Sequence, residues 1–321
     1  MIGNRLGWSL AAVLAVVLGL IAWQLAGVNR LTAPTSLLNE TRAFEPLASE
    51  VPPSAVYRYD TPGDSGPLYR QAIDAVRRDA SRYETAAMAE TPDDFEASDA
   101  WAALRAAAPL TGDAGLTKDP AIRAGYDGAA DDDVDALVLA ARCLGHTAQL
   151  RSADSPEQAR ALYEAQFALG AKLFDARIRY AETATALTIA RDASRGLRDL
   201  ADRAADPRRA SAAAAFDRSA EALLLRLGPV WGATAAIDGR VIARHCGDVY
   251  ALADAKTVER VWRVEAVLAL GRHRFNAERA ADRLVVPRRL AELERVEKDP
   301  FVLAAIQAAR GLTIEQYRTL R

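Results

Sequence analysis

The chain has 321 residues, of which 41 are basic and 43 acidic, so its net charge at pH 7 is −2. This balance excludes a general nucleic-acid surface, because binding to the phosphate backbone needs a marked excess of lysine and arginine. Hydrophobic residues make up 50 % of the chain, but alanine dominates them and aromatic residues contribute only 7 %. Such a composition favours close-packed helices over sheets.

Near the N-terminus, residues 6–28 form an apolar run without any ionisable side chain. At 1.5 Å per residue this run makes a helix about 34 Å long, enough to cross a hydrocarbon core of about 30 Å. Trp8 and Trp23 lie near its two ends, where amphipathic rings favour the headgroup level. The run is longer than the apolar region of a secretory signal, and no small-x-small cleavage site follows it. We therefore predict an uncleaved transmembrane anchor that contacts the lipid bilayer from Leu6 to Val28.

The orientation of this anchor follows from its flanks. Residues 1–5 form a short flank with one arginine, while Arg30 and Arg42 follow the span. A short flank favours a cytoplasmic N-terminus, which places the bulk of the chain outside the cytoplasm. A cleaved signal peptide is the alternative.

Residues 29–66 contain prolines, among them Pro34, Pro52, Pro53 and Pro62, that interrupt every regular element, so we predict a tether there. Within it, residues 56–59 are a candidate for a short extended piece docked on the domain. The remainder, residues 67–321, is predicted to be one all-α domain, with a possible subdivision near residue 228.

Helical periodicity and cap signals recur throughout this domain, and no stretch alternates with the period of a strand. Capping-box patterns begin at Ser155 and at Thr313. The predicted helices span about 67–89, 92–108, 132–151, 156–174, 176–204, 207–228, 230–252, 255–282, 287–297, 299–310 and 313–320.

Residues 109–131 form a long connection, a feature that is often functional or mobile in compact domains. The four acids that end this loop and open the next helix are Asp131, Asp132, Asp133 and Asp135. They do not match the spacing of a calcium-binding loop, which also requires a glycine and a terminal glutamate. We interpret them as acids that favour a helix N-terminus.

Leu144-Gly145, followed by the helix ARALYEAQFALGAKLF, resembles a tetratricopeptide-like helix pair. Leu169-Gly170 and Leu270-Gly271 repeat the dipeptide, but these glycines do not keep the family's period of about 34 residues. The resemblance implies antiparallel helical hairpins, as in an α-solenoid, and carries no binding residue across. Only four of the basic residues are lysine, and in this the chain also resembles membrane-anchored helical proteins of high-GC bacteria.

Two cysteines and two histidines form the candidate metal site. Cys143 and His146 share one face of a predicted helix, and His245 and Cys246 form a second pair. The four side chains have the chemistry of tetrahedral zinc ligands, and a cysteine–histidine pair also suits nucleophilic catalysis. The alternative is that they are ordinary core or surface residues. A disulfide between Cys143 and Cys246 is equally open, because spacing does not give their separation.

Five residues between 258 and 279 are the candidate partner-binding residues, namely Arg260, Trp262, Arg263, Arg272 and Arg274. Arginines interleaved with aromatic residues suit an acidic or peptide ligand, or anionic lipid headgroups. The alternative is an amphipathic helix whose arginines are solvated.

Taken together, these features predict a membrane-anchored binding or scaffold protein of the cell envelope, which holds a protein partner on a helical surface. The alternative is a cell-envelope enzyme or metal-binding protein that uses Cys143, His146, His245 and Cys246. The sequence has no phosphate-binding loop, covalent-haem motif or hydrolase motif. We therefore predict no cofactor, no nucleic-acid partner and no identifiable catalytic residue.

Overall fold

The computed structural model describes residues 56–89, 93–126, 129–236, 260–276 and 280–320. Within these ranges every regular element is a helix, and the sole β-type pairing is an isolated parallel bridge between Thr61 and Leu110. The prediction of an all-α protein is thereby confirmed for the described residues. The helices are α4 (Gly66–Arg78), α5 (Ala80–Ala86), α6 (Asp93–Glu96), α7 (Asp99–Ala107), α8 (Pro120–Arg123), α9 (Ala129–Arg151), α10 (Pro156–Asp175), α11 (Tyr180–Arg203), α12 (Pro207–Ala236), α14 (Arg260–Asn276), α15 (Ala280–Val296), α16 (Pro300–Gly311) and α17 (Ile314–Thr319).

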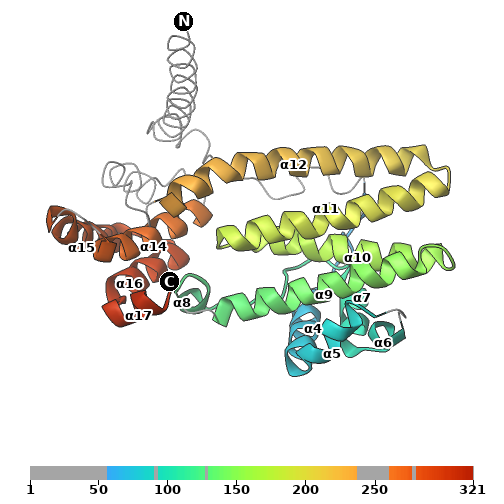
Figure 1. The fold of residues 1–321 in the computed structure, drawn as a ribbon, viewed down its shortest axis with the longest axis horizontal. Helices are drawn as coiled ribbons and strands as arrows, with labels where there is room; N and C mark the ends of the chain where they lie inside the picture. Colours follow the sequence, from blue (N-terminus) through green and yellow to red (C-terminus); the bar gives the residue numbers. More distant parts are fainter. Residues whose placement is uncertain (1–55, 90–92, 127–128, 237–259, 277–279, 321) are drawn as a thin grey trace, which may run out of the picture.

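The four longest helices, α9 to α12, lie side by side in chain order and form the body of the molecule (Figure 1). Short turns join them, so each helix runs antiparallel to the next. Helices α4 to α7 pack against the α9 side of this row, while α14 to α17 gather at one of its ends (Figure 1). The row therefore provides the frame on which both smaller groups of helices are fixed.

Small side chains bring α10 and α11 unusually close together. A Cβ atom placed on Gly170 would lie 2.7 Å from the backbone nitrogen of Ala190 and 2.8 Å from the carbonyl oxygen of Ala186. Both of these alanines are fully buried. The abundance of alanine in the sequence thus has a structural purpose, because small residues let two helix backbones approach without voids.

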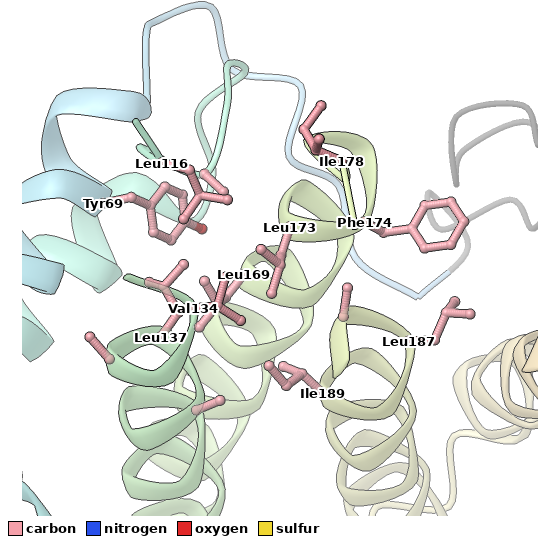
Figure 2. Close-up of a cluster of buried hydrophobic side chains, with 14 of the residues drawn as sticks. Tyr69, Leu116, Val134, Leu137, Leu169, Leu173, Phe174, Ile178, Leu187 and Ile189 are labelled. Atoms are coloured by element: carbon pink, nitrogen blue, oxygen red, sulfur yellow. The ribbon is translucent and has the colours of Figure 1, made fainter. Parts of the chain in front are cut away.

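The core runs along the row as one connected cluster of apolar side chains. Figure 2 shows Val134 and Leu137 of α9 close to Leu169 and Leu173 of α10, while Leu187 of α11 lies to one side, below Phe174. Each of these side chains is buried, and together they occupy the helix faces that the apolar periodicity predicts.

The end of the predicted tether is docked on the domain. Tyr57 and Tyr59 pack against the core, in line with the extended piece expected there. Farther along, the backbone N–H of Thr61 donates to the carbonyl of Pro109 at 3.0 Å, and the N–H of Thr111 donates to the carbonyl of Thr61 at 2.8 Å. The predicted long loop from residue 109 is therefore anchored at its start, and it also contains the short helix α8.

Several predicted helix ends differ from the structure. The helix predicted over 67–89 breaks at Asp79, whose backbone φ of −140° and ψ of 55° is not helical. The helix predicted to end at residue 228 continues to Ala236, and Pro287 lies inside α15 rather than at its start. Both predicted boundaries were placed at a proline, Pro229 in α12 and Pro287 in α15. A long helix that packs against its neighbours tolerates the loss of the one backbone hydrogen bond that an internal proline removes.

The two predicted capping boxes have different outcomes. At Thr313 the hydroxyl accepts from the N–H of Gln316 at 3.2 Å, and the side chain of Gln316 accepts from the N–H of Thr313 at 3.0 Å. This capping box is confirmed. Ser155 does precede α10, but its hydroxyl makes no capping hydrogen bond, so that capping box is wrong in its detail.

No helix in the described ranges is both long and apolar enough to cross a membrane. The predicted flank, anchor and first part of the tether, residues 1–55, lie outside those ranges.

Candidate functional site

A long groove runs between α9 and α11, with α10 beneath it and α5 at its edge. Its volume is about 1490 Å³, compared with about 100 Å³ for a second hollow that residues of α10, α11 and α12 line. The walls carry both polar and apolar side chains, which include Val138 and Gln149 from α9, Thr188 from α11 and Met88 beyond α5. Met88 is 78 % exposed, an unusual state for a large apolar side chain.

Two residues of α10, Tyr163 and Gln166, form the floor of this groove. They stand beneath two glycines of the walls. A Cβ atom on Gly145 would lie 3.1 Å from the amide nitrogen of Gln166, and one on Gly196 would lie 2.3 Å from the ring of Tyr163. The two glycines therefore make room for the floor side chains, which any larger residue in the walls would displace.

Gln166 is the most unusual residue of the groove. Its side chain is only 5 % exposed, and its Oε1 atom has no hydrogen-bond partner among the described residues. A buried polar atom without a partner costs roughly 1–3 kcal/mol of stability, so proteins rarely keep one without a reason. This amide oxygen is therefore an unmet hydrogen-bond acceptor buried at the floor of the groove.

The register of the helices shows what lies at the level of Gln166. Along the antiparallel pair α10 and α11, Gly170 meets Ala186 and Ala190, while Tyr163 meets Gly196. Interpolation between these two contacts places Gln166 level with Asp192, which also lines the groove. The amide oxygen and a carboxylate thus lie at the same height, one on the floor and the other in the wall.

The ionisable side chains of the groove are unequally neutralised. Arg195 pairs with Asp217 of α12 at 3.1 Å, and Arg203 donates to Ser152. By contrast, none of four other lining residues is in a salt bridge among the described residues, namely Glu84, Asp135, Arg142 and Asp192. Burial raises the pKa of Asp192 above the ordinary value, an effect that nearby Arg195 and Arg191 oppose. Three carboxylates face two guanidiniums that are in no salt bridge within the described ranges, those of Arg142 and Arg203, which leaves the groove an acidic excess of one charge.

Half of the candidate metal site lies in the described residues. Cys143 is a free, fully buried thiol whose Sγ atom donates to the carbonyl of Tyr83 at 3.2 Å. His146 lies at the edge of the groove, where Nε2 donates to the carbonyl of Ala89 at 2.7 Å. Both side chains thus face the segment around α5. His245 and Cys246 lie outside the described residues, among which no cluster of three metal-ligating side chains occurs.

We expect Cys143 to be unreactive in the native protein. Burial raises the pKa of its thiol from 9.0 to about 12, so almost no thiolate is present at pH 8. In a Cys246→Ser variant, a thiol reagent such as dithionitrobenzoate should modify less than about a tenth of the protein until denaturant is added. Rapid stoichiometric modification without denaturant would show that this thiol is accessible.

The candidate partner-binding residues are engaged within the protein. Trp262 is fully buried, and Arg263, which is 6 % exposed, forms an ion pair with Glu297. Arg260 pairs with Asp299 at 2.8 Å. Arg272 lies over the ring of Tyr126, and Arg274 donates to the carbonyls of Arg310 and Leu312. Arg260, Arg263 and Arg274 fasten the C-terminal helices together, while Arg272 and Trp262 contact Tyr126 and Tyr180 of the preceding part of the chain. The indole of Trp262 is fully buried and offers no surface to a partner.

Buried ion pairs that the sequence pattern did not indicate connect the parts of the molecule. Arg123 of α8 and Glu182 of α11 are 5 % and 3 % exposed, with Nη2 lying 2.8 Å from Oε2. Glu182 also accepts from the backbone N–H of Ile178 at 2.6 Å. Nearby, Arg179 pairs with Glu265 of α14 at 2.8 Å. Because the partners are far apart in the chain, no local signal identifies them.

The acids at the start of α9 have a specific role. Asp133 is buried and accepts from Arg70 at 2.7 Å and from Arg77 at 3.0 Å, while Asp132 lies 3.4 Å from Arg77. The interpretation of these acids as a helix N-terminal feature is therefore incomplete, since two of them also hold α4 against α9.

A buried lysine forms a second unusual polar cluster. Lys172 of α10 is 2 % exposed, and its Nζ atom donates to the carbonyl of Ala107 at 2.8 Å. The same atom lies 5.0 Å from the centre of the Tyr69 ring and 5.8 Å from that of Tyr59. This cluster joins α10, α4 and the docked segment before α4 through cation–π contacts. The sequence analysis did not single out Lys172, although a lysine within the apolar run ALGAKLF is a signal from which it could have been found.

Burial lowers the pKa of Lys172 from 10.5 to about 8, which makes stability depend on pH. Between these two values the unfolded chain holds a proton that the native protein has released, so stability rises with pH. Relative to a Lys172→Met variant, the unfolding free energy of the wild type should rise by about 1.4 kcal/mol per pH unit between pH 8 and 10. Denaturant unfolding at several pH values measures this difference, and equal slopes for the two proteins would contradict the assignment.

Comparison with protein-family models, with curated proteins and with solved structures gives no significant match. The class that the geometry itself defines is an all-α protein with a lateral groove, formed by two long helices above a third. Any statement about function therefore depends on the chemistry of that groove and on the sequence.

Proposed function

We propose that this protein is a membrane-anchored binding protein that holds a helical segment of a protein partner in the groove between α9 and α11. The observation that carries the proposal is the orphaned Oε1 of Gln166 on the groove floor, because a buried acceptor without a donor suits a site that a ligand completes. The row of antiparallel hairpins then acts as a short α-solenoid-like scaffold.

The shape and lining of the groove favour a helix as the occupant. Two parallel helices that flank a third, antiparallel one leave a trough in which another helix lies with its apolar face down. Val138 and Leu139 are partly buried on the α9 wall, and Met88 is exposed at the rim. Flexible methionines at a rim adapt to the side chains of a partner. The predicted anchor at residues 6–28 would hold this groove near the membrane surface.

Site-specific photo-crosslinking of the full-length chain in its native membranes tests the proposal. A photoreactive phenylalanine is placed at Thr188 on α11 and, separately, at Gln149 on α9, since both are exposed and line the groove. The matched control is Ser211, an exposed residue of α12 that lines neither hollow. We expect both groove positions to capture the same polypeptide, and mass spectrometry to locate the crosslink in a helical segment of it.

The control position decides how this experiment is interpreted. If Ser211 captures the same polypeptide as efficiently as Thr188, contact with the groove is not specific and the proposal fails. If neither groove position yields a product above background, the groove does not hold a protein segment.

A further inference from the structure

We propose that the centre of the groove is a site for a primary ammonium group, which a lysine side chain of the docked segment supplies to Gln166 and Asp192. This inference rests on the proposed function and adds the chemical identity of the group that the groove recognises. It derives from two independent features, an orphaned acceptor and an unneutralised carboxylate at the same level.

The acceptor without a partner determines which hydrogen-bonding group the ligand must bring. Oε1 of Gln166 has no partner in the described part of the chain, and an amide oxygen only accepts hydrogen bonds. A ligand that satisfies it must therefore bring an N–H or O–H donor. Gly145 and Gly196 add no side chain of their own to the groove, and the Gln166 amide and the Tyr163 ring fill the space next to them.

The charged side chains at this level determine the sign of the charge that the ligand should carry. Asp192 lines the groove at the height of Gln166 and is in no salt bridge within the described ranges. Arg191 and Arg195, its neighbours on α11, are both occupied by Asp217 of α12. Glu84 and Asp135 add two negative charges, and Arg142 and Arg203 oppose them with two positive charges, so the carboxylate of Asp192 gives this set its net negative charge. A cation gains from this field, whereas an anion is repelled.

The number of donors then favours ammonium over guanidinium. An ammonium group is a compact charge with three donors, which suits one carboxylate and one amide oxygen on different surfaces. A guanidinium group is planar and prefers a bidentate carboxylate in a fixed fork geometry. The acceptors here belong to two groups on different surfaces, the amide oxygen of Gln166 on the floor and the carboxylate of Asp192 in the wall.

The test uses a simple lysine mimic. Full-length protein in nanodiscs of zwitterionic lipid is titrated with 4,4,4-trifluorobutylammonium, and binding is followed by fluorine NMR of the ligand. The neutral analogue 4,4,4-trifluorobutanol controls for apolar binding. We expect the ammonium compound to bind and the alcohol not to bind. Gln166→Leu and Asp192→Asn should each weaken ammonium binding by about tenfold or more, in line with the loss of a hydrogen bond to a charged group.

Matched variants keep this test independent of folding. Asp202→Asn changes the charge of an exposed α11 residue outside the groove and should leave binding unchanged. Asp192 is itself exposed, so Asp192→Asn tests the proposal even if Gln166→Leu destabilises the fold. Equal binding of the ammonium and the alcohol, or undiminished binding by Asp192→Asn, overturns the inference.

Crosslinking separates this inference from the proposed function. If Thr188 still captures a partner segment in the Gln166→Leu/Asp192→Asn double variant as efficiently as in the wild type, the ammonium site is wrong and the binding function stands. If the mimic binds but no groove position captures a polypeptide, the ammonium group does not come from a lysine of a protein partner, and a free amine is the ligand. Loss of capture after acetylation of the partner's lysines supports the full proposal.

Discussion

Replacing Arg123 by methionine should lower the free energy of unfolding by about 3–5 kcal/mol, because it leaves the buried carboxylate of Glu182 without its charge partner. Arg123 donates to Oε1 of Glu182 at 2.9 Å and to Oε2 at 2.8 Å, and also to the carbonyl of Ala176 at 2.9 Å. Denaturant unfolding of the full-length protein in detergent, followed by the helical circular-dichroism signal, measures the loss.

Two further variants show that the loss comes from the buried charge. In Arg123→Met/Glu182→Gln the neutral amide still accepts from the backbone of Ile178, so we expect recovery of at least about 1 kcal/mol. Arg288→Met removes an exposed pair with Glu292 and should cost less than about 1 kcal/mol. If Arg123→Met costs no more than Arg288→Met, the pair contributes little to the stability of this fold.

Gly170→Ala should cost about 1–3 kcal/mol of stability, since the added methyl group would lie within 3 Å of backbone atoms of α11. Backbone atoms have no rotamer to change, so the two helices must move apart along their shared face. The groove depends on the same spacing, because its floor belongs to α10 and one wall belongs to α11. We therefore expect this substitution to weaken ligand binding in the groove as well as the fold.

Gly311→Ala is the matched control for this substitution. A Cβ atom at Gly311 meets nothing within 4 Å, and the residue is the last of α16. Alanine restricts the unfolded chain and favours the helix, so a gain of about 0.4–1 kcal/mol is expected. Thermal unfolding of the two variants beside the wild type should give shifts of opposite sign. A shift of the same sign in both would show that close approach at Gly170 is not what limits stability.

The comparison between Gly170 and Lys172 shows how position decides the role of a residue on one helix. Both lie on α10, two residues apart, and both are buried. Gly170 permits α11 to approach on one side, whereas Lys172 reaches Tyr59 and Tyr69 on another. A helix in the middle of a row is covered on several faces, so nearly every residue in its second half is enclosed.

Local sequence signals determined the all-α class and most of the helix positions. Apolar periodicity and cap residues act within a few positions of the chain, so they are legible without a structure, as the capping box at Thr313 shows. Proline misled the prediction at Pro287, because packing of the whole helix outweighed one missing hydrogen bond. The predicted membrane anchor at residues 6–28 is likewise a property of the sequence alone, since it lies outside the described residues.

The groove was decided by tertiary structure. Gln166 looks like an ordinary helical residue in the sequence, but in the fold Gly145 of α9 packs directly against it and its amide oxygen is buried without a donor. Arg263 and Trp262 looked like surface binding residues, yet ion pairing and burial turn them inward. The physical reason is the range of the interactions. Helix periodicity and capping span three to four residues, whereas desolvation and charge pairing depend on neighbours that are distant in the chain.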